Sequence, residues 1–291
     1  GRSGATRAGM TLSEMRRILS ARRIRLTKSL GQNFLHDGNQ LRRMVDLAAL
    51  RPSDQVIEIG PGLGPLTELL LAGAREVLAI EKDARLVGCL EERFAGDERL
   101  RLVHADAVDF LAGHPADWAS WKLVAALPYS AASEILMALA LAPTCPERLV
   151  ITLQQEVARR LSAGPGSPEY GILTLIVRHR CAPAAAFSIP ASCFFPPPKI
   201  TSTCLALDRR SGPGFSVSER RTFARLVRSA FSQRRKMMFK LLKSTWDEDA
   251  LRGAFETLGL SETCRAESLD LARFEALARH LRPSGADAER S

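Results

Sequence analysis

The sequence predicts an α/β protein with a parallel sheet, followed by a small domain that contains only helices. Strand-like and helix-like segments alternate from residue 39 to about residue 208, and a glycine-rich turn follows the first strand. No strand pattern follows the linker-like run from Ser211 to Gly214. Parallel strands need long crossover connections, which are usually helices, so the alternation indicates a parallel sheet.

The local patterns assign the elements in chain order. Residues 39–50 carry apolar side chains at helical spacing, whereas residues 55–59 form a short apolar run typical of a buried strand. Strands are expected at residues 55–59, 77–80, 100–104, 122–126, 148–153, 172–178 and 200–207. Helices are expected at residues 39–50, 66–72, 84–94 and 133–141, and then at residues 216–231, 233–243, 248–258 and 269–280.

This pattern divides the 291 residues into three parts. Residues 1–27 are expected to form a basic extension, with residues 1–20 loosely structured. Residues 28–210 form the α/β domain, and residues 215–291 form the helical domain.

The composition is that of a folded globular protein, with 46% hydrophobic and 25% charged residues. No apolar run approaches the roughly 20 residues of a membrane-spanning helix, and the N-terminus lacks an apolar secretory region. Six cysteines occur without a C-x-x-C pair or histidines at ligand spacing, so we expect reduced thiols and no metal site. These features favour a cytoplasmic protein with no membrane contact.

The net charge of +9 is concentrated in two segments. Residues 1–45 hold ten Arg or Lys and two acids, and residues 220–243 hold nine and none, so the remainder carries −8. Such a distribution favours a polyanionic partner, and nucleic acid in particular. A solvated helix face with a basic tail is the alternative.

A glycine-rich turn at residues 60–64 follows the first strand, in the order Gly-Pro-Gly-Leu-Gly. Glycines let the backbone approach a ligand closely, and Glu81, at the end of the next strand, can accept hydrogen bonds from both ribose hydroxyls of an adenosyl group. Both NAD and S-adenosylmethionine (SAM) are bound in this way. The G-x-G-x-G spacing and a further acid, Asp106, after the third strand favour SAM.

The fourth strand ends in Ala126-Leu127-Pro128-Tyr129. A polar residue followed by x-Pro-aromatic at this place is typical of methyltransferases that act on exocyclic amines, and this chain matches the x-Pro-aromatic part. The lone pair of such an amine is delocalised into the base, so the site must hold the amine in line with the methyl group. An aromatic ring that stacks on the extruded base contributes about 1–3 kcal/mol.

With these motifs the chain resembles the KsgA-type small-subunit rRNA adenine dimethyltransferases. The resemblance runs from Lys28 to about Lys243. The matching segments are residues 31–35, 58–64, 80–83, 105–107, 127–129, 155–161, 170–171, 194–199 and 231–236. It implies a Rossmann-like class I SAM-dependent methyltransferase fold and the transfer of two methyl groups to each of two adjacent adenines near the 3′ end of small-subunit rRNA. The implied partner is a pre-ribosomal particle, and we expect a monomer.

The resemblance also implies roles for particular residues. The cofactor residues would be Asn33 and Leu35 in a closing segment, Gly60 and Gly62 in the loop, Glu81 at the ribose, Asp106 at the adenine, and Ala126. The residues at the target base would be Ala126, the Leu127 carbonyl, the stacking ring of Tyr129, and Phe194 on the other face of the base. Arg234, Arg235 and Lys236 would face the RNA.

The departure from the family pattern that matters most is Ala126, which stands where the family usually has Asn; Thr201 also replaces a common Asp, with a smaller expected consequence. An alanine cannot accept a hydrogen bond from the target amine. Losing one such bond in the transition state costs roughly 2–4 kcal/mol, so we expect a slowed enzyme. Three alternatives remain: an assembly factor with weak or no catalysis, a resistance-type large-subunit rRNA methyltransferase, and an NAD-dependent oxidoreductase.

Overall fold

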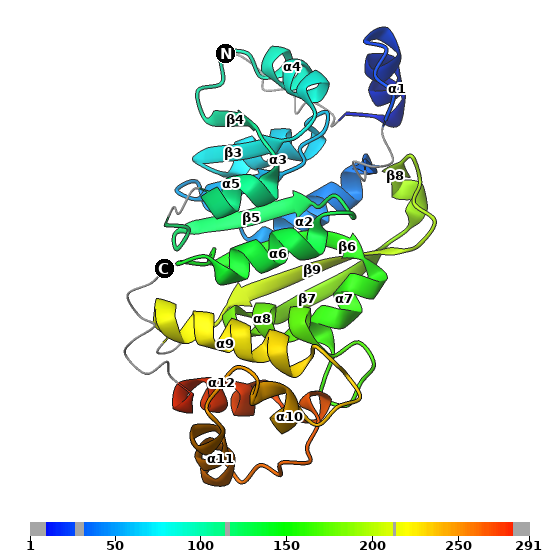
Figure 1. Ribbon diagram of the computed structural model, residues 1–291. Coiled ribbons are helices and arrows are strands. Elements are labelled where there is room, and N and C mark those ends of the chain that lie inside the picture. The colour runs from blue at the N-terminus through cyan, green and yellow to red at the C-terminus, as the bar shows by residue number, and fades with distance from the viewer. Residues whose placement is uncertain (1–9, 27–31, 114–116, 212–213, 282–291) are drawn as a thin grey trace.

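A seven-stranded sheet forms the centre of the protein in the computed structural model, which describes residues 10–26, 32–113, 117–211 and 214–281 (Figure 1). The strand order is β4-β3-β2-β5-β6-β9-β7. The five parallel strands are β2 (Gln55–Ile59), β3 (Glu76–Glu81), β4 (Leu100–His104), β5 (Trp121–Ala126) and β6 (Arg148–Gln154). The antiparallel strands β9 (Ser202–Arg209) and β7 (Cys181–Ile189) complete the sheet.

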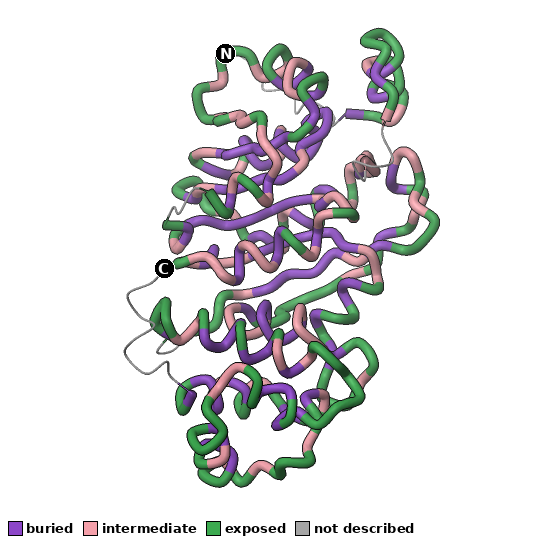
Figure 2. Tube along the Cα trace, in the orientation of Figure 1, coloured by how far each residue is buried: buried purple, intermediate pink, exposed green. Residues whose placement is uncertain are grey.

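Helices cover both faces of the sheet, so its central strands are buried, as the purple tube in Figure 2 shows, and their side chains are mainly apolar on both faces. On one face, Val56, Val124 and Val150 pack with residues of α2 (Gly38–Ala48) and α3 (Pro65–Gly73). On the other face, Ile57 and Leu123 share a core with α5 (Ala107–Gly113), α6 (Ala132–Leu141) and α8 (Ile172–Arg180). Further helices of this region are α4 (Ala84–Arg93) and α7 (Gln155–Ser162).

The C-terminal helices lie beyond the β7 edge of the sheet, coloured yellow to red in Figure 1. They are α9 (Val217–Ala230), α10 (Met238–Leu242), α11 (Glu248–Thr257) and α12 (Leu271–His280). Phe223, Phe255 and Phe274 are fully buried among them. One hydrophobic cluster continues from these rings through α8 to the sheet, so the helical region is anchored on the α/β core.

The expected strand at residues 172–178 is wrong, because this segment forms helix α8. Its short apolar run fits a strand and a buried helix equally well by pattern alone. The strand lies just after it, as β7, and was missed because its sequence is rich in alanine and contains Pro183. An edge position tolerates a proline there.

The N-terminal region also differs from expectation, because residues 12–21 form the helix α1 (Leu12–Ala21) instead of a loose extension. Thr11 and Glu14 form a reciprocal capping box at its start. Met15 and Leu19 are buried against Leu63 in the glycine-rich turn and Leu86 in α4. Residues 1–9 of the expected extension lie outside the described residues. In the expected helix 233–243, only Met238–Leu242 is helical.

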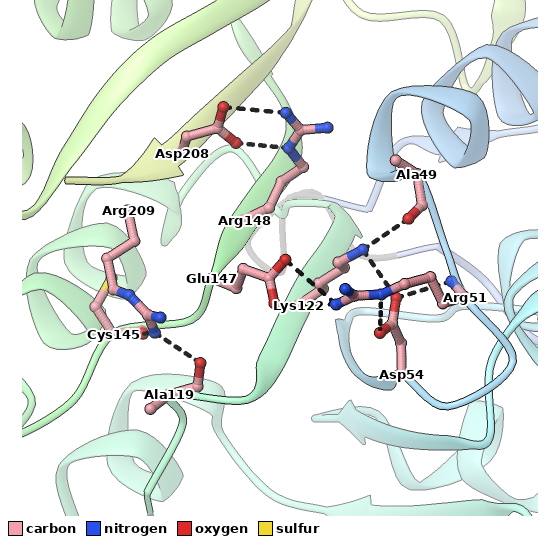
Figure 3. Close-up of polar contacts among 10 residues, drawn as sticks. All are labelled: Ala49, Arg51, Asp54, Ala119, Lys122, Cys145, Glu147, Arg148, Asp208 and Arg209. Carbon is pink, nitrogen blue, oxygen red and sulfur yellow. Dashed lines mark hydrogen bonds and ion pairs between the residues drawn. The ribbon is translucent and has the colours of Figure 1, made fainter. Parts of the chain in front are cut away.

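Polar contacts hold the amino ends of the strands together, at the edge opposite the glycine-rich turn (Figure 3). The buried Lys122 ammonium lies 2.8 Å from Asp54 and donates to the carbonyl of Ala49 at 2.7 Å. Burial alone would raise the pKa of Asp54, but Lys122 and Arg51 together hold it below its usual value. Arg148 pairs with Asp208 across β6 and β9.

The six cysteines are free thiols, as expected. Cys145 and Cys181 approach most closely, with their sulfur atoms 3.4 Å apart. In the part of the chain that the structure describes, no helix is both long and apolar enough to cross a membrane.

Candidate active site

A pocket opens at the carboxyl ends of the parallel strands, where the chain order of the sheet reverses. Strands β3 and β4 lie on one side of β2, whereas β5 lies on the other. Ligands of open α/β sheets bind at such a switch point. The pocket is lined by six of the seven residues predicted to hold the cofactor, namely Asn33, Leu35, Gly60, Glu81, Asp106 and Ala126.

The seventh, Gly62, belongs to the turn that forms one wall of the pocket. Gly60 and Gly62 have φ angles of +69° and +62°, which favour glycine. A Cβ on Gly62 would lie 2.8 Å from the ring of Phe34, and one on Gly60 would lie 3.5 Å from Pro128. The turn therefore packs closely between the closing segment and the loop after β5.

Glu81 is held in a fixed orientation at the end of β3. Its two carboxylate oxygens accept hydrogen bonds from the backbone N–H groups of Asp83, at 2.9 Å, and Gly62, at 3.2 Å. The side chain is buried, and this burial raises its pKa above the usual value. Each oxygen keeps a lone pair for a ligand hydroxyl.

Asp106 follows β4 and lies at the same pocket. Lys82 donates to one carboxylate oxygen at 2.7 Å, and the backbone N–H of Val108 donates to the other at 2.8 Å. The hydrogen bond from Lys82 is the main reason why the pKa of Asp106 lies below its usual value. Asp106 is therefore an ionised acceptor, suited to an exocyclic amine.

Sequence reasoning did not single out Glu58, although it lines the pocket. Its side chain is 1% exposed and accepts a hydrogen bond from the Thr67 hydroxyl at 2.7 Å. Burial raises the pKa of Glu58 to about 8. The sequence signal that could have indicated Glu58 is its position as an acid between Ile57 and Ile59 in the apolar strand β2.

The protonation of Glu58 predicts a pH-dependent stability. The folded protein keeps a proton that the unfolded chain releases above the ordinary pKa of 4.5, so this contribution is complete below 4.5 and is lost towards about pH 8. Glu58→Gln removes the dependence. We expect the free energy of unfolding of the Glu58→Gln variant, measured in urea without SAM, to rise relative to that of the wild type as the pH increases from 4.5 to about 8. The expected rise is up to about 1.4 kcal/mol per pH unit. A difference that is constant with pH, or equal to that of the exposed Glu98→Gln control, would contradict this.

A short antiparallel ladder closes the pocket from the N-terminal side. Strand β1 (Phe34–Leu35) pairs with β8 (Phe194–Phe195). The side-chain amide of Asn33 donates to the carbonyl of Pro196 at 2.6 Å, and that of Gln32 donates to Asp83 at 3.0 Å. The predicted closing segment is thus joined to Asp83, which follows β3, and to Pro196, which follows β8.

Tyr129 and Phe194, the two aromatic residues predicted at the target base, lie side by side. Their ring centroids are 6.3 Å apart, and the interplanar angle is 59°. Two parallel rings around a base need a separation of roughly 7 Å, because stacked atoms lie about 3.5 Å apart. Phe194 is also only 2% exposed. Neither ring is among the residues that line the pocket, and a base could lie between the two rings only if they moved apart.

The predicted RNA-facing residues differ in their surroundings. Arg234 pairs with Glu267 at 3.1 Å and donates to the carbonyl of Ser167. Arg235 and Lys236 are exposed and form no ion pair within the described residues. The structure therefore leaves two of the three cations available to an external phosphate.

The strand order, the antiparallel β9 and the pocket at the switch point define a Rossmann-like class I methyltransferase fold with an added helical region. Residues 23–281 match the family model described as ribosomal RNA adenine dimethylase, and the chain belongs to this family. The family and fold expected from the motifs are thereby confirmed.

The chain is similar in sequence to curated methyltransferases over most of its length. It is 35% identical over 284 residues to the ribosomal RNA small subunit methyltransferase A of Geobacillus thermodenitrificans, covering 94% of this chain and 97% of that protein. It is 38% identical to the protein of the same name from Clostridium botulinum, covering 89% and 95%.

Two solved structures have a similar fold. The 23S rRNA methyltransferase ErmE has a TM-score of 0.63 at 26% identity, covering 86% of this chain and 99% of its own. A dimethyladenosine transferase from Plasmodium falciparum has a TM-score of 0.70 at 23% identity, covering 84% and 95%.

Proposed function

We propose that this protein uses SAM to dimethylate the N6 amines of two adjacent adenines near the 3′ end of small-subunit rRNA. The observation that carries the proposal is a single pocket in which Glu81, Asp106 and the glycine-rich turn meet the end of β5, beside Pro128. Membership of the adenine dimethylase family and 35–38% identity to small-subunit methyltransferases support the same activity.

The residues of the pocket fit SAM chemically. Glu81 would accept hydrogen bonds from the ribose hydroxyls, and the ionised Asp106 would accept one from the adenine amine. The positive φ of Gly60 lets the backbone approach the methionine part, and Asn33 and Leu35 would close over it. When bound, SAM supplies an electrophilic methyl group on its sulfonium.

The end of β5 would hold the target adenine. Tyr129 would stack on the base, with its hydroxyl fixed by a hydrogen bond to the Ser202 hydroxyl. The Leu127 side chain is buried, so this residue offers the target amine only its backbone carbonyl, which is a hydrogen-bond acceptor. Ala126 has no side-chain acceptor, and this absence favours the second candidate function, a small-subunit assembly factor with weak catalysis.

Incubation with labelled SAM and unmethylated small subunits, followed by nucleoside analysis, tests the proposal. We expect N6,N6-dimethyladenosine in small-subunit rRNA. Binding to the subunits without any methylation would favour the assembly factor. Methylation of large-subunit rRNA alone would favour the activity named for ErmE. We further propose that the substrate is a cytoplasmic pre-ribosomal particle and that the enzyme acts as a monomer.

The exposed cations after α9 are proposed to contact RNA phosphates. Replacing Arg235 and Lys236 together by Ala should weaken subunit binding and lower the slope of log affinity against log salt concentration by about 2, because two fewer counterions are released. SAM affinity should stay the same. The matched control replaces the exposed Arg75 and Arg101, which lie at the amino ends of β3 and β4, away from the glycine-rich turn. This control should leave the slope unchanged. An unchanged slope in the Arg235 and Lys236 variant would show that these residues form a solvated surface and do not contact RNA phosphates.

A further inference from the structure

The side-chain hydroxyl of Thr152 lies unpaired beside the end of β5. Thr152 is 1% exposed, and its hydroxyl oxygen has no hydrogen-bond partner within the described ranges, 10–26, 32–113, 117–211 and 214–281. In the parallel ladder between β5 and β6, Thr152 is the register partner of Ala126. The unpaired hydroxyl is therefore adjacent to Ala126, the main departure from the family pattern.

Thr152 and Ala126 point to the same face of the sheet. Paired residues on neighbouring strands share a face, and this face also carries Val124 and Val150, two residues earlier on each strand. Ala126 lines the pocket. Neighbouring strands lie about 4.8 Å apart, so the hydroxyl of Thr152 is one strand spacing from the pocket wall.

The stacking residue lies over the same strand end. Tyr129 follows β5, and its hydroxyl reaches the hydroxyl of Ser202 on β9. Strand β6 runs between β5 and β9, and Ser202 is the register partner of Gln154, so the Tyr129 side chain spans the end of β6 two residues beyond Thr152. The Ser202 hydroxyl is occupied by this contact, whereas that of Thr152 is not.

Packing alone gives no reason for a hydroxyl at this position. Burying a polar group without a partner is unfavourable, and valine has nearly the same shape. Rotation about the χ1 bond re-aims the hydroxyl without moving the strand. A hydroxyl can accept one hydrogen bond while donating another, as the amine of an adenine requires.

We propose that Thr152 supplies the side-chain hydrogen-bond acceptor for the target amine, in place of the amide that Ala126 lacks. Ala126 lines the pocket and Thr152 does not, so the buried hydroxyl would have to reach the amine past the small Ala126 methyl group when the target base is bound. This inference rests on the proposed methyltransferase function. It assigns a further catalytic residue from the unpaired hydroxyl and its register with Ala126.

A double-mutant cycle tests the assignment by single-turnover methylation of small subunits. Thr152→Val should lower kcat by about 10-fold or more, as expected for one lost transition-state hydrogen bond, with unchanged KM for subunits and unchanged SAM affinity by calorimetry. Thr152→Ser keeps the hydroxyl and should retain the rate. In the Ala126→Asn background, Thr152→Val should change kcat less than 3-fold, roughly, because the amide is then present.

Thermal unfolding separates this role from a structural one. The Val variant should melt at the same temperature as wild type or higher, because an unpaired buried hydroxyl is removed. Thr203→Val, on β9 and facing the other side of the sheet, is the control and should leave kcat unchanged.

Two results would overturn the inference while leaving the proposed function intact. One is a Thr152→Val enzyme as fast as wild type. The other is an equal loss of kcat on Thr152→Val in the wild-type and Ala126→Asn backgrounds, which would show that Thr152 does not stand in for the amide. If the wild-type protein forms no dimethyladenosine at all, the proposed function and this inference both fail.

Discussion

Ala126→Asn is expected to raise kcat by about 10-fold to 10³-fold, which corresponds to roughly 1.4–4 kcal/mol of transition-state stabilisation. The target amine loses a proton as each methyl group arrives, and an amide carried by residue 126 itself should align it better than the proposed Thr152 hydroxyl, which belongs to the neighbouring strand. Ala126 lines the pocket, so a longer side chain extends into open space. The new amide also lies beside the unpaired hydroxyl of Thr152 and can satisfy it.

The gain should appear in kcat, with subunit binding and SAM affinity nearly unchanged, because the added interaction acts mainly in the transition state. The gain should be larger in the Thr152→Val background, where no alternative acceptor remains. The control is Ala126→Leu, which fills the same space without a polar group and should not raise kcat. An Asn variant no faster than wild type would show that the missing amide does not limit the reaction.

Glu81→Ala is expected to weaken SAM binding by about 2 kcal/mol or more, close to 30-fold in Kd, because two hydrogen bonds to a charged acceptor are lost. The backbone contacts from Gly62 and Asp83 hold this carboxylate in place before the ligand arrives. Calorimetry with SAM measures the effect directly.

Glu76→Ala is the matched control, since Glu76 begins the strand that Glu81 ends. It should bind SAM like wild type. Glu81→Gln keeps an acceptor for Gly62 and Asp83 and should lose less affinity than the Ala variant. Unchanged affinity in Glu81→Ala would remove Glu81 from the site, and tighter binding of NADH than of SAM would contradict the assigned cofactor.

The sequence alone determined the parallel part of the sheet and the position of the pocket that we propose to hold SAM. Strands β2 to β6 alternate with helices, and the crossover geometry of parallel strands then leaves few arrangements. The carboxyl ends of parallel strands meet at one edge, so Gly60, Glu81 and Asp106 had to converge although they are far apart in the chain. Local chemistry and strand direction were sufficient for this part.

Only the tertiary structure decided the identity of segments whose patterns are ambiguous or weak. Residues 172–180 are apolar enough for a strand, and their burial between α6 and the C-terminal helices makes them helix α8. Helix α1 depends on the contacts of Met15 and Leu19 with Leu63, which lies more than forty residues away in the chain. The local signal, a Thr11–Glu14 capping box followed by Met15 and Leu19 at helical spacing, covers only ten residues within a basic segment and was missed.

The register of the strands was likewise decided by the three-dimensional structure. A one-residue shift of β6 against β5 would turn Thr152 to the opposite face, and no local pattern in either strand specifies their mutual alignment. The same holds for the Tyr129 and Phe194 rings, whose separation and tilt follow from the β1–β8 ladder and the Ser202 contact. The sequence determined that six of the predicted cofactor residues would line one pocket, and packing between distant segments determined how the other predicted residues lie around it.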